Sequence, residues 1–100
     1  MNVQITSRKF KAKDGLKAEI TEQLKSLEKF NDDIIDANVI LSYTHLKDSI
    51  KTVEINLNIP GKTLTATETA EEYVIALPKT ISKLQKQLKT LKSKRIAKTR

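Results

Sequence analysis

The sequence predicts an α/β (α+β) two-layer sandwich with the order β-α-β-β-β-α, in which two helices pack on one face of a four-stranded sheet. Apolar and polar residues alternate in four segments, and apolar residues recur every third or fourth position in two others. Clean alternation means that one sheet face is buried and the other is wet. The chain has 100 residues, which is enough for one domain with a modest core.

The N-terminal elements are a strand and a helix. Residues 2–7 alternate and predict a short strand. The spacing then changes and predicts a helix over residues 16–30, with Asp14 as its N-cap or first-turn acid and with "NDD" ending it. Its apolar stripe is Leu16, Ile20, Leu24 and Leu27.

Three more strands follow. "IDANVILSYT", "KTVEINLNI" and "TLTATE" each alternate, and they are separated by a hairpin loop at "HLKDS" and a Pro-Gly turn. These three predict an antiparallel meander. The first strand reaches the second through a helix, so the two are expected to be parallel if they are neighbours.

The last helix is expected to open at Glu71, and its apolar seam is Leu77, Ile81, Leu84, Leu88 and Leu91. Pro78 disturbs this pattern, because proline inside a helix removes a hydrogen bond and costs roughly 3 kcal/mol. Either "EEYVIAL" is a separate turn and Pro78 begins the main helix, or one long helix kinks at Pro78. We prefer the kinked helix.

The charge is concentrated at the C-terminal end. The net charge is +7, but residues 78–100 carry nine basic groups and no acidic one, whereas residues 1–77 have a net charge of −2. Such a surface favours polyanions, first nucleic acid and then anionic membranes. A solvated helix is the plainer alternative, but its lysines would normally alternate with Glu.

No catalytic or metal-binding constellation is visible. His45 is the only histidine and is expected in a loop, and Asp32, Asp33 and Asp36 lack the spacing of a calcium loop. Two glycines cannot build a phosphate-binding loop, and no base is available to activate a Ser or Thr. We therefore expect no enzymatic activity, no cofactor and no metal.

The cysteine count and the N-terminus bear on location. Cysteine is absent, which excludes disulfides and is consistent with a reducing compartment. No signal-like segment and no membrane-spanning apolar run occurs. A cytoplasmic protein is expected.

The basic residues of the last helix form a candidate phosphate-binding surface. On a helical wheel centred on Leu84, Lys92 and Arg95 fall near the seam. Across the far face lie Lys79, Lys83, Lys86, Lys89 and Lys94. The first helix adds Lys25 and Lys29, so that two adjacent helices would form one cationic strip.

The composition of this strip indicates what it recognises. Lysines bind phosphates as point charges and read no base. Four aromatic residues are too few to stack unpaired bases. Recognition of the backbone shape of a folded RNA fits best.

The element order and three segments resemble the ribosome hibernation-promoting factor family, also called ribosome-associated inhibitors or ribosomal subunit interface proteins. "LEKFNDDIIDANVIL" resembles its helix-to-strand segment and "INLNIPGKTLTATETAEE" its strand–turn–strand segment. "ISKLQKQLKTLKSK" is similar to its basic second helix. The resemblance covers residues 1–95, which it assigns to one ribosome-binding domain, with residues 96–100 as a basic tail.

The resemblance implies a translation inhibitor that binds the small ribosomal subunit and its rRNA. It would occupy the mRNA and tRNA channel and silence idle ribosomes in stress or stationary phase. Carried over by position, the contacts are Arg8 after the first strand, Lys29 on the first helix, and Lys83, Lys86, Lys89 and Lys92 on the second.

Some features depart from the family pattern. Gln23 and Ser26 stand where relatives often have Lys, and Pro78 replaces a residue that is commonly acidic. Long members carry a second domain that pairs ribosomes, and this sequence ends before it. A short-form role is implied. We expect the protein to be a monomer when it is not bound to ribosomes, with no small-molecule substrate and no membrane partner.

Two alternatives remain. A general double-stranded RNA-binding module also packs two helices on a meander. A protein-interaction or membrane-binding role would use the apolar seam or the lysines of the last helix, but the seam is needed to cover the sheet.

Overall fold

The structure, a computed structural model, describes residues 1–8, 11–31, 33–43 and 50–98, with side chains as far as Leu91. The expected loop at "HLKDS" with His45, and Asp32, lie outside the described residues. So do the side chains of Lys92, Lys94 and Arg95, although their backbone is helical.

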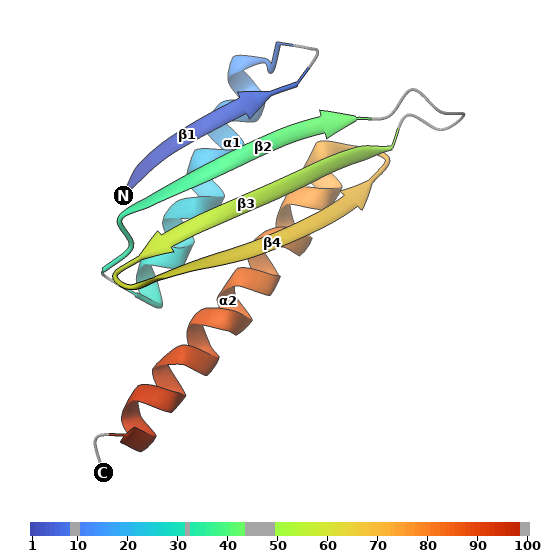
Figure 1. Cartoon of the computed structure of the whole chain (residues 1–100). Coiled ribbons are helices and arrows are strands. Elements are labelled where there is room, and N and C mark those ends of the chain that lie inside the picture. Colours follow the sequence, from blue (N-terminus) through green and yellow to red (C-terminus); the bar gives the residue numbers. More distant parts are fainter. Residues whose placement is uncertain (9–10, 32, 44–49, 99–100) are drawn as a thin grey trace.

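The four strands form one sheet in the order β1-β2-β3-β4 (Figure 1). β1 pairs with β2 in parallel, and the other two pairs are antiparallel. The predicted fold class, parallel pair and meander are confirmed. The strand bounds are Asn2–Ser7 for β1, Asp36–Tyr43 for β2, Lys51–Ile59 for β3 and Lys62–Ala70 for β4.

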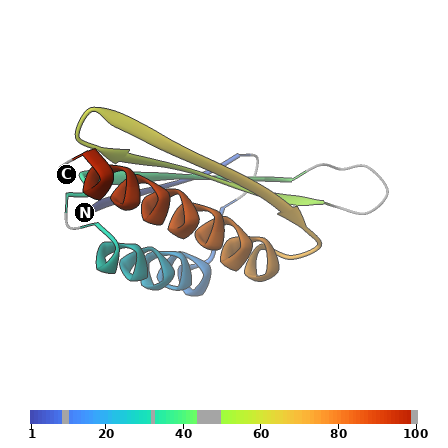
Figure 2. The same ribbon diagram turned by 90° about the horizontal axis from the view of Figure 1, so that it is seen from below.

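Both helices cover the same face of the sheet (Figure 2). The helix α1 spans Asp14–Lys25 and continues as a 3₁₀ turn, η1, over Ser26–Lys29, and α2 spans Tyr73–Lys98. The predicted first helix is therefore an α-helix that tightens in its last turn, as helix ends often do.

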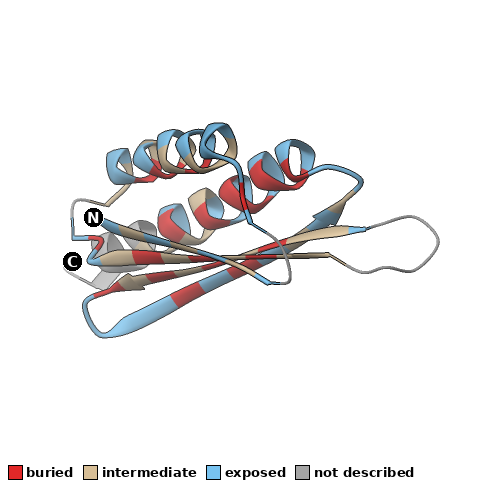
Figure 3. Ribbon diagram, turned by 90° about the horizontal axis from the view of Figure 1, so that it is seen from above, coloured by how far each residue is buried: buried red, intermediate tan, exposed pale blue. Residues whose placement is uncertain are grey.

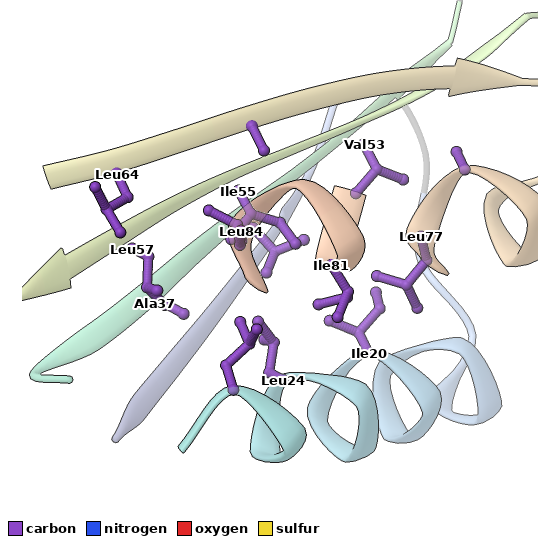
Figure 4. Close-up of a cluster of buried hydrophobic side chains, with 14 of the residues drawn as sticks. Ile20, Leu24, Ala37, Val53, Ile55, Leu57, Leu64, Leu77, Ile81 and Leu84 are labelled. Atoms are coloured by element: carbon purple, nitrogen blue, oxygen red, sulfur yellow. The ribbon is translucent and has the colours of Figure 1, made fainter. Parts of the chain in front are cut away.

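The core lies between the two layers. Alternate residues of β2, β3 and β4 are buried, and Figure 3 shows them as red bands along the strands of the sheet that the two helices cover. Ile55 of β3 and Leu84 of α2 are fully buried and lie close together in Figure 4, with Ile20 and Leu24 of α1 below them. Burying such aliphatic side chains contributes about 1.5–3 kcal/mol each before entropy is counted.

Pro78 lies inside α2, and the helix runs through it from Tyr73. The hypothesis of a separate turn that ends at Pro78 is wrong. Pro78 cannot donate to the carbonyl of Val74, so one helical hydrogen bond is missing there. The helix also starts later than Glu71, because the Glu72 carbonyl accepts the first bonds, from the backbone N–H groups of Ile75 and Ala76 at 3.1 Å.

Polar contacts fix the start of α2 on the sheet. The Tyr73 hydroxyl donates to the Ser42 carbonyl of β2 at 3.0 Å. Burial raises the pKa of Tyr73, and the neighbouring Tyr43 adds to this. Thr80 is buried, but its hydroxyl donates to the Ala76 carbonyl at 2.9 Å, so its burial leaves no unsatisfied group.

The turn between β3 and β4 has only two residues, since Ile59 pairs with Lys62. Pro60 excludes the primed turns that hairpins usually use, because its φ cannot be positive. Gly61 has a φ of 77°, which is the value that the third position of a type II turn needs. This turn holds Lys62 at the start of β4.

The open face of the sheet is polar. Asn58 of β3 donates to the Asp36 carboxylate of β2 and accepts from the Thr63 hydroxyl of β4 at 2.8 Å. The Thr65 hydroxyl donates to Asn56 at 2.9 Å in the same manner. Asp36 thus belongs to a cross-strand ladder, which explains an acidic residue at that position without a metal.

Candidate nucleic-acid interface

The positive charge belongs to α2 more than to the helix layer as a whole. Residues 73–98 contain eight basic residues and no acidic one. Residues 14–29, in α1 and η1, contain three lysines and four acidic residues. The first helix can therefore extend a cationic strip only through Lys25 and Lys29, the two lysines that the sequence analysis selected near its C-terminal end.

The chain direction brings that end beside the basic half of α2. Both helices run the same way along the sheet, so their C-terminal ends lie at the end of the molecule that also holds the β3–β4 turn (Figures 1 and 2). Lys25 and Lys29 are exposed there. The Lys89 ammonium lies 5.3 Å from the centroid of the Phe30 ring, which joins η1 to α2. Lys25 also lies in the last turn of α1, where its positive charge interacts favourably with the negative end of the helix dipole.

Lys83 lies on the flank of α2 that faces β4, not on the far face. Its ammonium is 2.6 Å from a Glu68 carboxylate oxygen and donates to the Thr67 carbonyl at 3.2 Å. The wheel places it about 100° from the centre of the seam, where its long stem reaches the sheet edge. The hydrogen bond from Lys83 holds the pKa of Glu68 below its ordinary value, with smaller help from the charges of Lys83 and Lys79.

A second residue of the helix holds the same edge. The side-chain amide of Gln87 donates to the Thr65 carbonyl of β4 at 3.1 Å. Lys83 and Gln87, one helical turn apart, thus satisfy two carbonyls of the edge strand. These bonds protect the β4 edge from pairing with another chain and fix the rotation of α2.

Lys86 lines a surface groove of about 320 Å³ between α2 and β4. Lys62, at the start of β4, lines the same groove. Sequence reasoning missed Lys62, because a helical wheel considers one helix at a time. The signal that could have found it is its position next to the Pro-Gly turn, at the strand end nearest the basic half of α2.

Arg8 is not brought together with the other candidates. It follows β1, and its backbone N–H donates to the Leu41 carbonyl at 2.9 Å. That is the end of the sheet opposite to the β3–β4 turn and the C-terminal ends of the helices (Figure 1). Lys79, in the second turn of α2, is exposed and lies between these two ends.

The described residues contain no group of three or more His, Cys, Asp or Glu side chains that could hold a metal ion. Among the helices of the described part, none is long and apolar enough to cross a bilayer.

Comparisons with known proteins point to one group. The sequence profile of the family described as "Sigma 54 modulation protein / S30EA ribosomal protein" matches residues 3–96. The ribosome hibernation promotion factor of Deinococcus radiodurans is 27% identical over 93 residues. That match covers 91% of this chain but 49% of the relative, so the chain spans about half of its length.

Two solved structures share the fold. A ribosomal subunit interface protein from Coxiella burnetii gives a TM-score of 0.84 at 22% identity, covering 93% of this chain and 99% of that one. The N-terminal domain of Protein Y from Thermus thermophilus gives 0.82 at 22% identity, covering 91% and 99%.

Proposed function

The chain belongs to the sigma 54 modulation protein/S30EA ribosomal protein family, and from that premise we propose that it binds the small ribosomal subunit and keeps idle ribosomes from translating. The name of the Deinococcus radiodurans relative suggests the hibernation role, and the name of the Coxiella burnetii protein suggests binding at the subunit interface. The proposal needs no catalytic step.

The observation that carries this proposal is the acid-free surface of α2. Lys79, Lys86 and Lys89 are exposed on it, and no acidic residue occurs anywhere in the helix. A rigid helix held on a sheet presents these charges at fixed spacing. Phosphates of a folded RNA, which are also fixed in space, match such a surface better than a mobile strand does.

The proposed mechanism is occlusion of the channel that mRNA and the A- and P-site tRNAs use. A protein that fills this path competes with mRNA and initiator tRNA for empty small subunits. Ribosomes that are already loaded should resist it. Induction in stress or stationary phase is the matching biological setting.

We assign the rRNA contacts unequally. Lys86 and Lys89, with Lys25 and Lys29 at the same end, form the proposed centre, and Lys79 extends it along α2. Lys83 can join only by leaving Glu68. The basic residues Lys92, Lys94 and Arg95 continue the same helix, and Arg8 would contact a separate part of the rRNA.

Co-sedimentation with separated subunits tests this function. Stoichiometric binding to small subunits is expected, with far weaker binding to large subunits and to free duplex RNA. Equal binding to all three would favour a general double-stranded RNA-binding module instead. Pre-loading small subunits with mRNA and initiator tRNA should abolish binding, and undiminished binding to loaded subunits would contradict occlusion.

A further inference from the structure

We propose that the groove between α2 and β4 is a binding subsite for one sugar–phosphate unit of an RNA strand, held by Lys62 from the sheet and Lys86 from the helix. The volume of about 320 Å³ lies at the small end of ligand sites. This inference rests on the proposed function, because it names a further part of the same RNA-binding surface.

The charged side chains that line the groove are all positive. Lys62 and Lys86 line it, and no carboxylate of the described residues does. Within the described part of the chain, neither ammonium has an ion-pair or hydrogen-bond partner, whereas Lys83 is paired with Glu68 and Lys51 donates to the Glu71 carbonyl at 2.9 Å. Two ammonium groups around one groove repel each other, and an anion between them removes this repulsion.

The remaining lining suits a sugar. Leu64 and Leu91 supply apolar surface, and Gln87 and Thr90 supply an amide and a hydroxyl. The Gln87 nitrogen is already bonded to the Thr65 carbonyl, so its oxygen is oriented and can accept from a ribose hydroxyl. A phosphate beside an apolar and hydroxyl-binding surface is the chemistry of a nucleic-acid backbone.

Rigid elements hold the two lysines. The Pro60–Gly61 turn, with its φ of 77° at Gly61, fixes the start of β4. The Gln87 bond to β4 fixes α2, only one residue beyond Lys86. Only the lysine stems have to be ordered when the phosphate binds, which lowers the entropic cost of binding.

The test measures binding to small subunits by co-sedimentation and to a short single-stranded RNA oligonucleotide by fluorescence anisotropy, each over a salt series. Lys62→Gln should weaken both about tenfold at physiological salt and flatten the slope of log K against log salt by about 0.7–0.9. Lys62→Arg should keep binding within about twofold of the unchanged protein, because it keeps the charge. Lys13→Gln, which removes another exposed charge before α1, is the matched control and should change the slope by far less.

A double-mutant cycle separates a shared phosphate from two separate contacts. If Lys62 and Lys86 hold one phosphate, the loss in Lys62→Gln/Lys86→Gln should be smaller than the product of the two single losses. A loss equal to that product would overturn the shared subsite. Equal effects of Lys62→Gln and Lys13→Gln would also overturn it, by showing that net charge alone acts.

The oligonucleotide arm keeps this inference separate from the proposed function. If Lys62→Gln binds small subunits as tightly as the unchanged protein, the groove is not an RNA subsite, but the proposed function stands. If the unchanged protein does not bind small subunits, but Lys62→Gln weakens oligonucleotide binding, the proposed function is wrong and the groove subsite stands. Ribose 5-phosphate, as a free probe, should shift the Gln87 amide signal only at millimolar concentration. Saturation at micromolar concentration would reassign the groove to a small metabolite and overturn the inference.

Discussion

The lysines of the helix layer differ in their neighbours, and each neighbour decides how readily the ammonium can meet a phosphate. Lys83 is held by Glu68, and Lys89 rests over Phe30. Lys86 has neither kind of partner among the described residues. A helical wheel treats the three as equivalent, but the structure does not.

The Lys83–Glu68 ion pair can be tested by titration. The pair lowers the folded-state pKa of Glu68 below 4.5, so its contribution to stability is present above pH 4.5 and is lost as the pH falls through the lowered value. In Lys83→Gln, the pKa of Glu68 should return towards 4.5, as followed by ¹³C NMR of the carboxyl carbon. An unchanged pKa would mean that the pair does not form in solution.

Releasing Lys83 from Glu68 should help RNA binding. Glu68→Gln removes the competing carboxylate, so we expect tighter binding to small subunits, by about two- to fivefold, with little change in melting temperature, since the Lys83 partner is exposed and Glu68 is only half-buried. Glu54→Gln, on the opposite face of the sheet, removes the same charge without touching Lys83. Equal gains in both variants would assign the effect to net charge.

Gly61 is the residue whose replacement should harm the fold. Gly61→Ala should destabilise the protein by about 1–2 kcal/mol, because a side chain disfavours a φ of 77°. Gly15→Ala is the matched control: nothing lies within 4 Å of the added Cβ, and alanine favours the helix. Urea unfolding measures the free energy of unfolding of both variants. Equal stabilities would show that the turn tolerates another conformation.

At the scale of elements, the sequence pattern predicted more of the sheet than of the last helix. Strict alternation predicted β3 with the bounds that the structure has, Lys51–Ile59, because one buried face imposes a period of two. The start of α2 was missed by two residues, since Glu71 and Glu72 suit either a helix turn or the bend before it. The Lys83–Glu68 pair and the Lys62–Lys86 groove join residues far apart in the sequence, and no local pattern contains such information.

Pro78 offers a test of how α2 is held. Pro78→Ala restores the hydrogen bond to the Val74 carbonyl at an exposed position and should stabilise the protein by about 1–3 kcal/mol. Part of this gain is offset, because proline also restricts the unfolded chain. Thermal and urea unfolding measure the net change in the free energy of unfolding. A loss of stability would show that proline shapes the contact of α2 with the sheet.

At the scale of the whole molecule, the topology gathers charge that the sequence spreads out. Because α1 and α2 run in the same direction, Lys25 and Lys29 lie at the end that holds the basic half of α2 and Lys62. The open face of the sheet holds two carboxylates, Asp36 and Glu54, which are tied into hydrogen bonds. A cationic helix surface backed by a weakly acidic sheet face has one side suited to RNA.

The salt dependence of small-subunit binding tests this account most directly. In Lys79→Gln/Lys86→Gln/Lys89→Gln, the buried seam and the ion pair of Lys83 are untouched and only the contact of Lys89 with Phe30 is lost, so the melting temperature should fall by no more than a few degrees. The slope of log K against log salt should flatten by about two to three, and the affinity should fall by roughly a thousandfold at physiological salt. The matched variant Lys11→Gln/Lys13→Gln/Lys17→Gln removes the same charge around the start of α1 and should keep most of the slope. Equal losses in the two triple variants would contradict the account, because net charge and not the surface of α2 would then drive binding.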